Sequence, residues 1–242
     1  MGPSIPDTLR VRLLVMLVLA LLPVLGVLLY VGYEVEASTR KEAGERAEHL
    51  AGLAAKRFDI QLQAVHDKLQ VLARVPAVRT GAGTDCRRFL QKVAENTPSL
   101  ANIGVIGFGG QVPCSVRSVR AEVNAAALPS FTEAMVTGRF TVGGFHIGGI
   151  THEPVVVLVQ PFKGAEAPGG AVFAALSLDW ADRFAGRTHL PTGASMTLMD
   201  GNGRILARSP RPSRWQGKTA PHGSTLARLL PADIGVGDGP GL

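Results

Sequence analysis

Residues 154–178 read PVVVLVQPFKGAEAPGGAVFAALSL and contain two apolar runs of strand length. The first run covers residues 154–162, and the second covers residues 170–178. Glycine and proline between them, at residues 164–169, are typical of a turn. Runs of this length and composition, with a turn signal between them, predict two strands joined by a turn.

Further strand signals lie on the N-terminal side of this pair. Residues 102–108 and 111–116 flank Gly109-Gly110, a hairpin turn signal, and residues 139–147 form another apolar run. Five strands are enough for a sheet with its own core. Short helices are expected between and around these strands, at residues 86–96, 128–137 and 180–186. The pattern predicts an α+β fold.

A second unit begins near residue 190. Residues 194–199 and 204–207 are expected strands around the turn sequence DGNG, and residues 225–230 are expected to be helical. Two strands are marginal alone. The sequence therefore predicts an incomplete second lobe over residues 190–242.

A long helix is expected before the sheet, over residues 34–75, because this stretch has no proline and is rich in good helix formers. Its apolar side chains recur at steps of four and three, and Pro76 ends the pattern. Two interpretations stay open: the stripe packs on its own domain, or it forms the seam of a homodimer. The stripe consists of Ala51, Ala55, Phe58, Leu62, Val65, Leu69 and Leu72.

Residues 13–33 form a run of 21 residues without charge, which is long enough to span a bilayer as a helix. A cleavable signal peptide would have a shorter apolar region ending in small residues, so an uncleaved anchor is favoured. Basic residues lie on both sides of the run, at residues 10 and 12 and at residues 40, 41 and 46. The charge rule for orientation therefore does not decide which side faces the cytoplasm.

Composition limits the function classes. The 242 residues are 46% hydrophobic and 18% charged, with a mean hydropathy of +0.20, which excludes a disordered chain. The net charge is +6 and the isoelectric point is about 9.8, but the basic residues are scattered. We therefore expect no nucleic-acid partner.

No catalytic constellation stands out. His152-Glu153 is followed by Pro154, so there is no H-E-x-x-H helix, and the glycine-rich stretches lack the nucleotide-binding spacings. His146 and His152 have no clear third ligand for a metal. The sequence predicts no enzyme activity, no metal site and no cofactor in these residues.

Two cysteines, Cys86 and Cys114, lie in an expected helix and an expected hairpin strand. Such positions can reach the Cα separation that a disulfide needs. Spacing alone leaves a disulfide and two unrelated thiols equally open.

Several segments together resemble a known family. They are DCRRFLQKVAENTPSLANIGVIGFGGQVPCS, FTEAMVTGRFTVGGFHIGGITHEPVVVLVQPF, GGAVFAALSLDWADRF and LPTGASMTLMDGNGRILARSPRPSRWQGK, in this order after an anchor and a long helix. This arrangement is similar to the periplasmic double-Cache (PDC, PAS-like) sensor region of bacterial receptors, such as histidine kinases and GGDEF diguanylate cyclases. The resemblance covers roughly residues 10–230.

The resemblance implies a domain order. Residues 1–12 would be cytoplasmic, residues 13–33 would cross the inner membrane, and residues 34–76 would form a stalk. Residues 85–189 would be the membrane-distal lobe, with a PAS-like antiparallel sheet, and residues 190–242 the start of the membrane-proximal one. A periplasmic location would favour the Cys86–Cys114 disulfide, and the output domain would lie beyond this chain.

The chain departs from the amino-acid-binding members of that family. Their arginine and aromatic residue, which clamp the ligand, correspond to the stretch Leu128-Pro129-Ser130-Phe131, and their acidic residue corresponds to Ala175. Both features are missing, so the sequence does not support an α-amino acid ligand.

The expected function is sensing of an unknown small molecule or of stress. The rival hypothesis is an envelope protein that binds or scaffolds without signalling. We expect the pocket in the distal lobe, between the sheet and residues 128–150. The candidate ligand-binding residues are Phe131, Arg139, Phe145, His146 and Gln160.

Overall fold

The computed structural model describes residues 6–81, 83–119, 123–164, 169–186, 190, 194–210 and 212–220. The chain forms two compact units, Met1–His49 and Leu50–Leu242. Within the described residues, no helical segment combines the length and the hydropathy that crossing a membrane requires. The helix expected at residues 225–230 lies outside the described residues.

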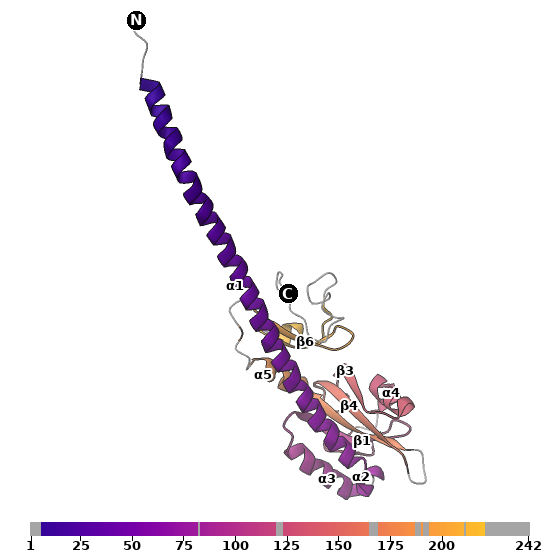
Figure 1. Cartoon of the computed structure of the whole chain (residues 1–242). Helices are drawn as coiled ribbons and strands as arrows, with labels where there is room; N and C mark the ends of the chain where they lie inside the picture. Colours follow the sequence, from indigo (N-terminus) through magenta and orange to yellow (C-terminus); the bar gives the residue numbers. More distant parts are fainter. Residues whose placement is uncertain are drawn as a thin grey trace. The chain divides into compact units, whose positions relative to one another are not determined.

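Helices and strands follow one another in groups along the chain (Figure 1). The helices are α1 (Pro6–Leu72), α2 (Pro76–Arg79), α3 (Gly83–Glu95), α4 (Pro129–Thr137), α5 (Leu178–Gly186) and α6 (Pro212–Trp215), with a 3-10 turn η1 (Ala125–Ala127). The strands are β1 (Leu100–Gly107), β2 (Cys114–Ser115), β3 (Thr141–Ile147), β4 (Pro154–Phe162), β5 (Gly170–Ser177), β6 (Met196–Met199) and β7 (Ile205–Ser209).

Five strands form one antiparallel sheet in the order β2-β1-β5-β4-β3. The two strands predicted from residues 154–178 are neighbours, with Val159 opposite Phe173 and Leu158 opposite Ala174. Strand β5 also pairs with β1, so it lies at the centre of the sheet. The predicted α+β class with an antiparallel sheet is confirmed for this part of the chain.

Each face of the sheet has its own apolar core. Alternating residues of β4 separate between them: Val156 and Leu158 belong to one core, while Val155 and Val157 belong to the other. We call these the inner core, which also takes in residues of α1 and α3, and the outer core, which takes in residues of α4. Figure 1 shows α3 and α4 on opposite sides of the sheet. Because both faces are covered, β4 and β5 read as continuous apolar runs.

The C-terminal part of α1 packs into the inner core. Val65, Leu69 and Leu72 are buried, and Phe58 and Leu62 are partly buried against them. Packing on its own domain is therefore the correct interpretation of the stripe over residues 58–72. The helix ends at Leu72, and Pro76 begins the short helix α2 instead of simply ending the long one, since proline is favoured in the first turn of a helix.

A disulfide joins Cys86 in α3 to Cys114 in β2, with their Cα atoms 6.4 Å apart. Both residues are buried in the inner core. The bond ties the helix that covers the sheet to the edge strand of that sheet. The predicted Cys86–Cys114 pairing is confirmed.

Strands β6 and β7 form the two-stranded sheet expected in residues 190–242. Leu206 and Ala207 of β7 are buried in the inner core, and Leu198 of β6 is partly buried against it. The hairpin therefore shares an apolar core with the five-stranded sheet.

Candidate ligand-binding site

A cavity of about 150 Å³ lies on the outer-core face of the five-stranded sheet. Its floor comes from β1, β4 and β5, and its walls come from the segment before α4 and from the loop between β3 and β4. The lining residues are Asn102, Ile106, Val112, Val123, Asn124, Ala125, Ala127, Leu128, His146, Gly148, Gly149, Ile150, Thr151, Val155, Val157, Phe173 and Ala175.

Small residues leave room for the cavity. Ala175 lies in the middle of the sheet, opposite Asn102 of β1 and Val157 of β4, and it presents only a methyl group. Gly148 and Gly149 line the loop wall, and this loop is closed by hydrogen bonds. Gly148 N–H donates to the Glu153 carbonyl at 2.9 Å, and the N–H of His152 donates to the Gly148 carbonyl at 2.8 Å.

The loop needs one backbone conformation that side chains rarely adopt. His152 has a φ of 58°, in the left-handed region. Among the described residues, no other non-glycine residue has a positive φ. Histidine is one of the residue types found there more often than most. The tight turn brings Ile150 and Thr151 to the cavity.

Asn102 is the buried polar residue at the floor, with 2% of its surface exposed. Its Nδ2 atom donates to Ser115 Oγ at 2.8 Å, and its Oδ1 atom accepts from the backbone N–H of Arg117 at 3.1 Å. These bonds hold the chain that follows β2 beside β1. The Asn102 amide is therefore occupied mainly with its own fold.

The segment before α4 is held by another asparagine. Asn124 Oδ1 accepts a hydrogen bond of 2.8 Å from the backbone N–H of Ala126 and caps the turn η1. This capping bond places Ala125, Ala127 and Leu128 along one wall. The Asn124 oxygen is thus also committed to local structure.

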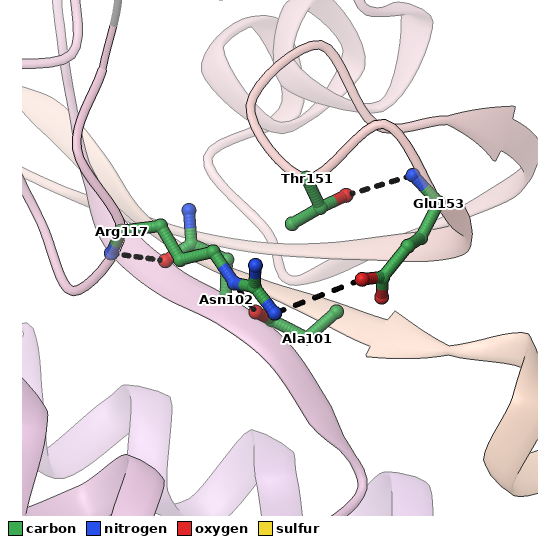
Figure 2. A network of polar contacts seen from close by, with 5 residues as sticks. All are labelled: Ala101, Asn102, Arg117, Thr151 and Glu153. Atoms are coloured by element: carbon green, nitrogen blue, oxygen red, sulfur yellow. Dashed lines mark hydrogen bonds and ion pairs between the residues drawn. The ribbon is translucent and has the colours of Figure 1, made fainter.

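An ion pair joins the two sides of the site near Asn102. Figure 2 shows Arg117 reaching across the sheet toward Glu153, and their nearest atoms, Nη2 and Oε1, are 3.7 Å apart. Arg117 Nε also donates to the Ala101 carbonyl at 3.1 Å. The two side chains are 50% and 41% exposed, so the pair lies at the surface.

Two polar side chains at the cavity are less constrained. Thr151 is buried, and its Oγ1 accepts from the backbone N–H of Glu153 at 3.4 Å, which leaves its hydroxyl proton free to donate (Figure 2). Within the described residues, the His146 ring has no hydrogen-bond partner, and it is exposed. These two groups, the second N–H of the Asn102 amide and the exposed Asn124 NH2 group are side-chain hydrogen-bonding groups that a ligand would meet.

The candidate residues named from the sequence are not gathered in one place. His146 lines the cavity, and Phe131 of α4 is buried in the outer core beside it. Arg139 is exposed and lies between α4 and β3.

Phe145 and Gln160 face the other side of the sheet. Phe145 lies opposite Val156 and packs against the inner core, with the Arg204 guanidinium 5.9 Å from its ring centre. Gln160 lies two residues after Leu158 of the inner core, and its Nε2 donates to the Pro161 carbonyl at 3.1 Å. Neither lines the cavity.

Two positions singled out by the departure from amino-acid-binding receptors do line the cavity. These are Leu128 and Ala175. Sequence reasoning missed Asn102 and Thr151 as lining residues. A polar asparagine inside the apolar run of residues 102–106 is the signal that would have drawn attention to Asn102.

The described residues contain no cluster of three histidine, cysteine or acidic side chains that could hold a metal ion. The cavity lining also has no nucleophile hydrogen-bonded to a base. Its geometry fits binding of a small molecule.

No family model and no curated protein matches the sequence. Solved structures do match. The ligand-binding domain of the Pseudomonas fluorescens chemoreceptor CtaA, bound to L-serine, has a TM-score of 0.61 and 16% identity over 74% of this chain and 77% of that one. The extracellular domain of a histidine kinase has a TM-score of 0.66 and 17% identity over 76% and 77%.

A third match is the ligand-binding domain of the Pseudomonas aeruginosa chemoreceptor PctC, bound to GABA. It has a TM-score of 0.59 and 16% identity, over 74% of this chain and 80% of that one. The relatives are ligand-binding sensor domains and not catalytic domains. The chain therefore has the Cache (PDC-like) fold of bacterial extracytoplasmic sensor domains, as its sequence predicted.

Proposed function

We propose that the chain is the extracytoplasmic sensor region of a membrane receptor and that it binds a small molecule in the cavity on the outer face of its sheet. The observation that carries this proposal is the cavity itself, in a fold whose solved relatives include domains bound to L-serine and GABA. A mostly apolar pocket with a few polar groups is the usual form of a small-molecule site.

The location is part of the proposal. Residues 13–33 are uncharged, and the leucines described there, at 14, 17, 19, 21, 22 and 25, are each between 56% and 64% exposed. An exposed apolar stretch of this size favours burial in lipid. The Cys86–Cys114 disulfide supports an oxidising compartment for the sheet. We infer a cytoplasmic N-terminus, an anchor at residues 13–33 and a periplasmic sensor.

The two faces of the sheet suggest how binding would be transmitted. Phe173 and Ala175 of β5 line the cavity, while Ala174 and Leu176, between and after them, belong to the inner core with Leu69 of α1. A ligand that favours one arrangement of β5 would shift the population of arrangements beneath α1. An output domain, such as a histidine kinase or diguanylate cyclase, would lie outside residues 1–242.

Topology can be tested with reporter fusions. Alkaline phosphatase fused after Val75 is expected to be active, because the enzyme requires the periplasm to form its disulfides. A green fluorescent protein fused at the same residue is expected to be dark if exported in the unfolded state. An inactive phosphatase together with a bright fluorescent fusion would contradict the proposed orientation.

Binding can be tested by thermal shift of the full chain in detergent. The panel would contain amino acids, small carboxylates and neutral apolar compounds. At least one compound is expected to raise the unfolding temperature saturably. Ala175→Leu, which fills the cavity, should remove the shift, and Ala126→Leu, which adds the same volume at an exposed neighbouring position, should retain it. A shift unaffected by Ala175→Leu would place binding elsewhere.

A further inference from the structure

We infer that the cavity selects a small uncharged molecule that is mostly apolar and carries one hydrogen-bonding group. The inference rests on the proposed function, because it names the chemical class that this site would take. It separates this chain from relatives whose structures hold L-serine or GABA.

Charge is the first argument. Among the described residues that line the cavity, none is Asp, Glu, Lys or Arg. A buried charge is costly unless it is paired and hydrogen-bonded. The nearby charged groups, Arg117 and Glu153, already pair with each other at the surface. A zwitterion placed here would find, among the described lining residues, no side-chain counter-ion for its carboxylate or its ammonium group.

Hydrogen-bonding capacity is the second argument. The Asn102 amide and the Asn124 oxygen are already bonded to Ser115, Arg117 and Ala126. What remains inside the cavity is the Thr151 hydroxyl proton and the second N–H of the Asn102 amide, and the exposed His146 ring and Asn124 side-chain NH2 group lie at its edge. The two inner donors suit one ligand hydroxyl, carbonyl or ether oxygen. Among the described lining residues, no carboxylate accepts from the three N–H donors of a ligand ammonium group, and no cation balances a ligand carboxylate.

Size is the third argument. The cavity measures about 150 Å³. An apolar cavity of about this size in another protein stays dry and holds benzene. The floor of valine, isoleucine, phenylalanine and alanine side chains offers the same kind of surface. A compact molecule on the order of six non-hydrogen atoms therefore matches the space.

The test compares two probes that share a branched apolar group, isoamyl alcohol and L-leucine. The full chain, labelled at the isoleucine δ1 methyl groups, is placed in lipid nanodiscs and observed by NMR. Ile106 and Ile150 line the cavity, whereas Ile103 belongs to the inner core and serves as an internal control. A local readout of this kind is insensitive to alcohol dissolved in the lipid, which produces no saturable shift at these two methyls alone.

We expect isoamyl alcohol to shift the Ile106 and Ile150 resonances saturably, to leave Ile103 in place, and to lose this effect in Ala175→Leu but not in Ala126→Leu. L-leucine is expected to have no effect. The wild-type comparison does not depend on either variant folding. A saturable response to L-leucine, with or without one to the alcohol, would overturn the inference and leave the proposed sensor function standing. No response to either probe would overturn the inference and also remove the cavity as support for the sensor function.

Discussion

The backbone N–H of Phe145 in β3 donates a hydrogen bond of 3.2 Å to the Oδ2 atom of Asp200, in the turn between β6 and β7. The other oxygen, Oδ1, accepts from the backbone N–H groups of Asn202 and Arg204, each at 3.0 Å. One carboxylate thus shapes its own turn and fastens the hairpin to the edge of the five-stranded sheet. Phe145 was a candidate ligand contact from the sequence, but in the structure it lies where the hairpin meets the five-stranded sheet.

Replacing this carboxylate should weaken the attachment of the hairpin. Asp200→Ala removes three acceptor contacts, and we expect it to lower the free energy of unfolding by about 2 kcal/mol, since hydrogen bonds to charged groups contribute about 1.5–3 kcal/mol. Asp200→Asn, which keeps one acceptor for the turn, should cost less. Urea unfolding followed by circular dichroism would measure both, and equal stability of Asp200→Ala and the wild type would contradict the prediction.

In the polar network of Figure 2, we expect Asn102 to contribute more to stability than Glu153. Asn102→Ala removes the hydrogen-bond partner of the buried Ser115 hydroxyl and of the half-buried Arg117 N–H. It should lower the free energy of unfolding by about 1–3 kcal/mol. Glu153→Gln only breaks a half-exposed ion pair and should cost less than about 1 kcal/mol. Urea unfolding at low and high salt would separate them, because only the Glu153 effect should shrink with salt. The opposite ranking would show that the ion pair holds the site.

The packing of α1 can be tested with two neighbouring positions. Leu69 is fully buried in the inner core, and Val71 is 63% exposed. Leu69→Ala should lower the free energy of unfolding by about 2–5 kcal/mol, and Val71→Ala should change it by no more than about 0.5 kcal/mol. Both effects should be independent of protein concentration. A concentration-dependent effect at Leu69 would instead place this residue at an interface between two chains.

The disulfide is expected to contribute to stability. Its two cysteines are separated by 28 residues, and loops of that size correspond to about 3 kcal/mol in the chain-entropy model. Dithiothreitol should therefore lower the unfolding temperature of the wild type. The Cys86→Ser/Cys114→Ser double variant should unfold at that lower temperature with or without the reductant. A wild type indifferent to the reductant would show that the bond adds little.

Asp182 should give the protein a pH-dependent stability. Burial raises the pKa of this α5 residue to about 6 from 3.8, the backbone amide of Arg208 opposes the rise, and the charge of Asp179 adds to it. The folded state therefore binds the proton more tightly than the unfolded state. The contribution of Asp182 to stability should be fully present below about pH 4 and should be lost as the pH rises through about 6.

Asp182→Asn is the matched variant, because an amide oxygen can still accept the 3.1 Å hydrogen bond from Gln216 Nε2. Relative to the variant, the wild type should lose stability between about pH 4 and pH 7, and this difference should be flat above about pH 7. Thermal unfolding of both proteins over this range measures it. Parallel pH profiles would contradict the shifted pKa.

Much of the fold could be predicted because the turn residues that begin and end its strands lie next to those strands in the sequence. Strand β4 has the predicted bounds, Pro154 and Phe162, since the residues around it are typical of turns. Strand β2 is shorter than the predicted residues 111–116, because Pro113 has no N–H for the ladder. The disulfide needed the resemblance to a known family, since its spacing alone was ambiguous.

The site was harder to predict because both faces of the sheet are apolar. Alternation separates Gln160 from Val157, but it does not tell which face holds a cavity and which holds a filled core. That depends on how α1, α3 and α4 cover the sheet, which is a matter of tertiary packing. His146 lies on the cavity face because its partner in β4 is Val155 of the outer core, whereas Gln160 shares its face with Leu158 of the inner core.

Interleaving along β4 and β5 has a consequence for how this protein can evolve. Substitutions at 157 or 175 alter the surface that a ligand meets, whereas substitutions at 156 or 174 alter the support of α1. Adjacent positions therefore meet different physical constraints, and the chemistry of the cavity can change at every second position without loosening the packing of the helix. A few small substitutions, each on one side of a single strand, are enough to remake the cavity lining.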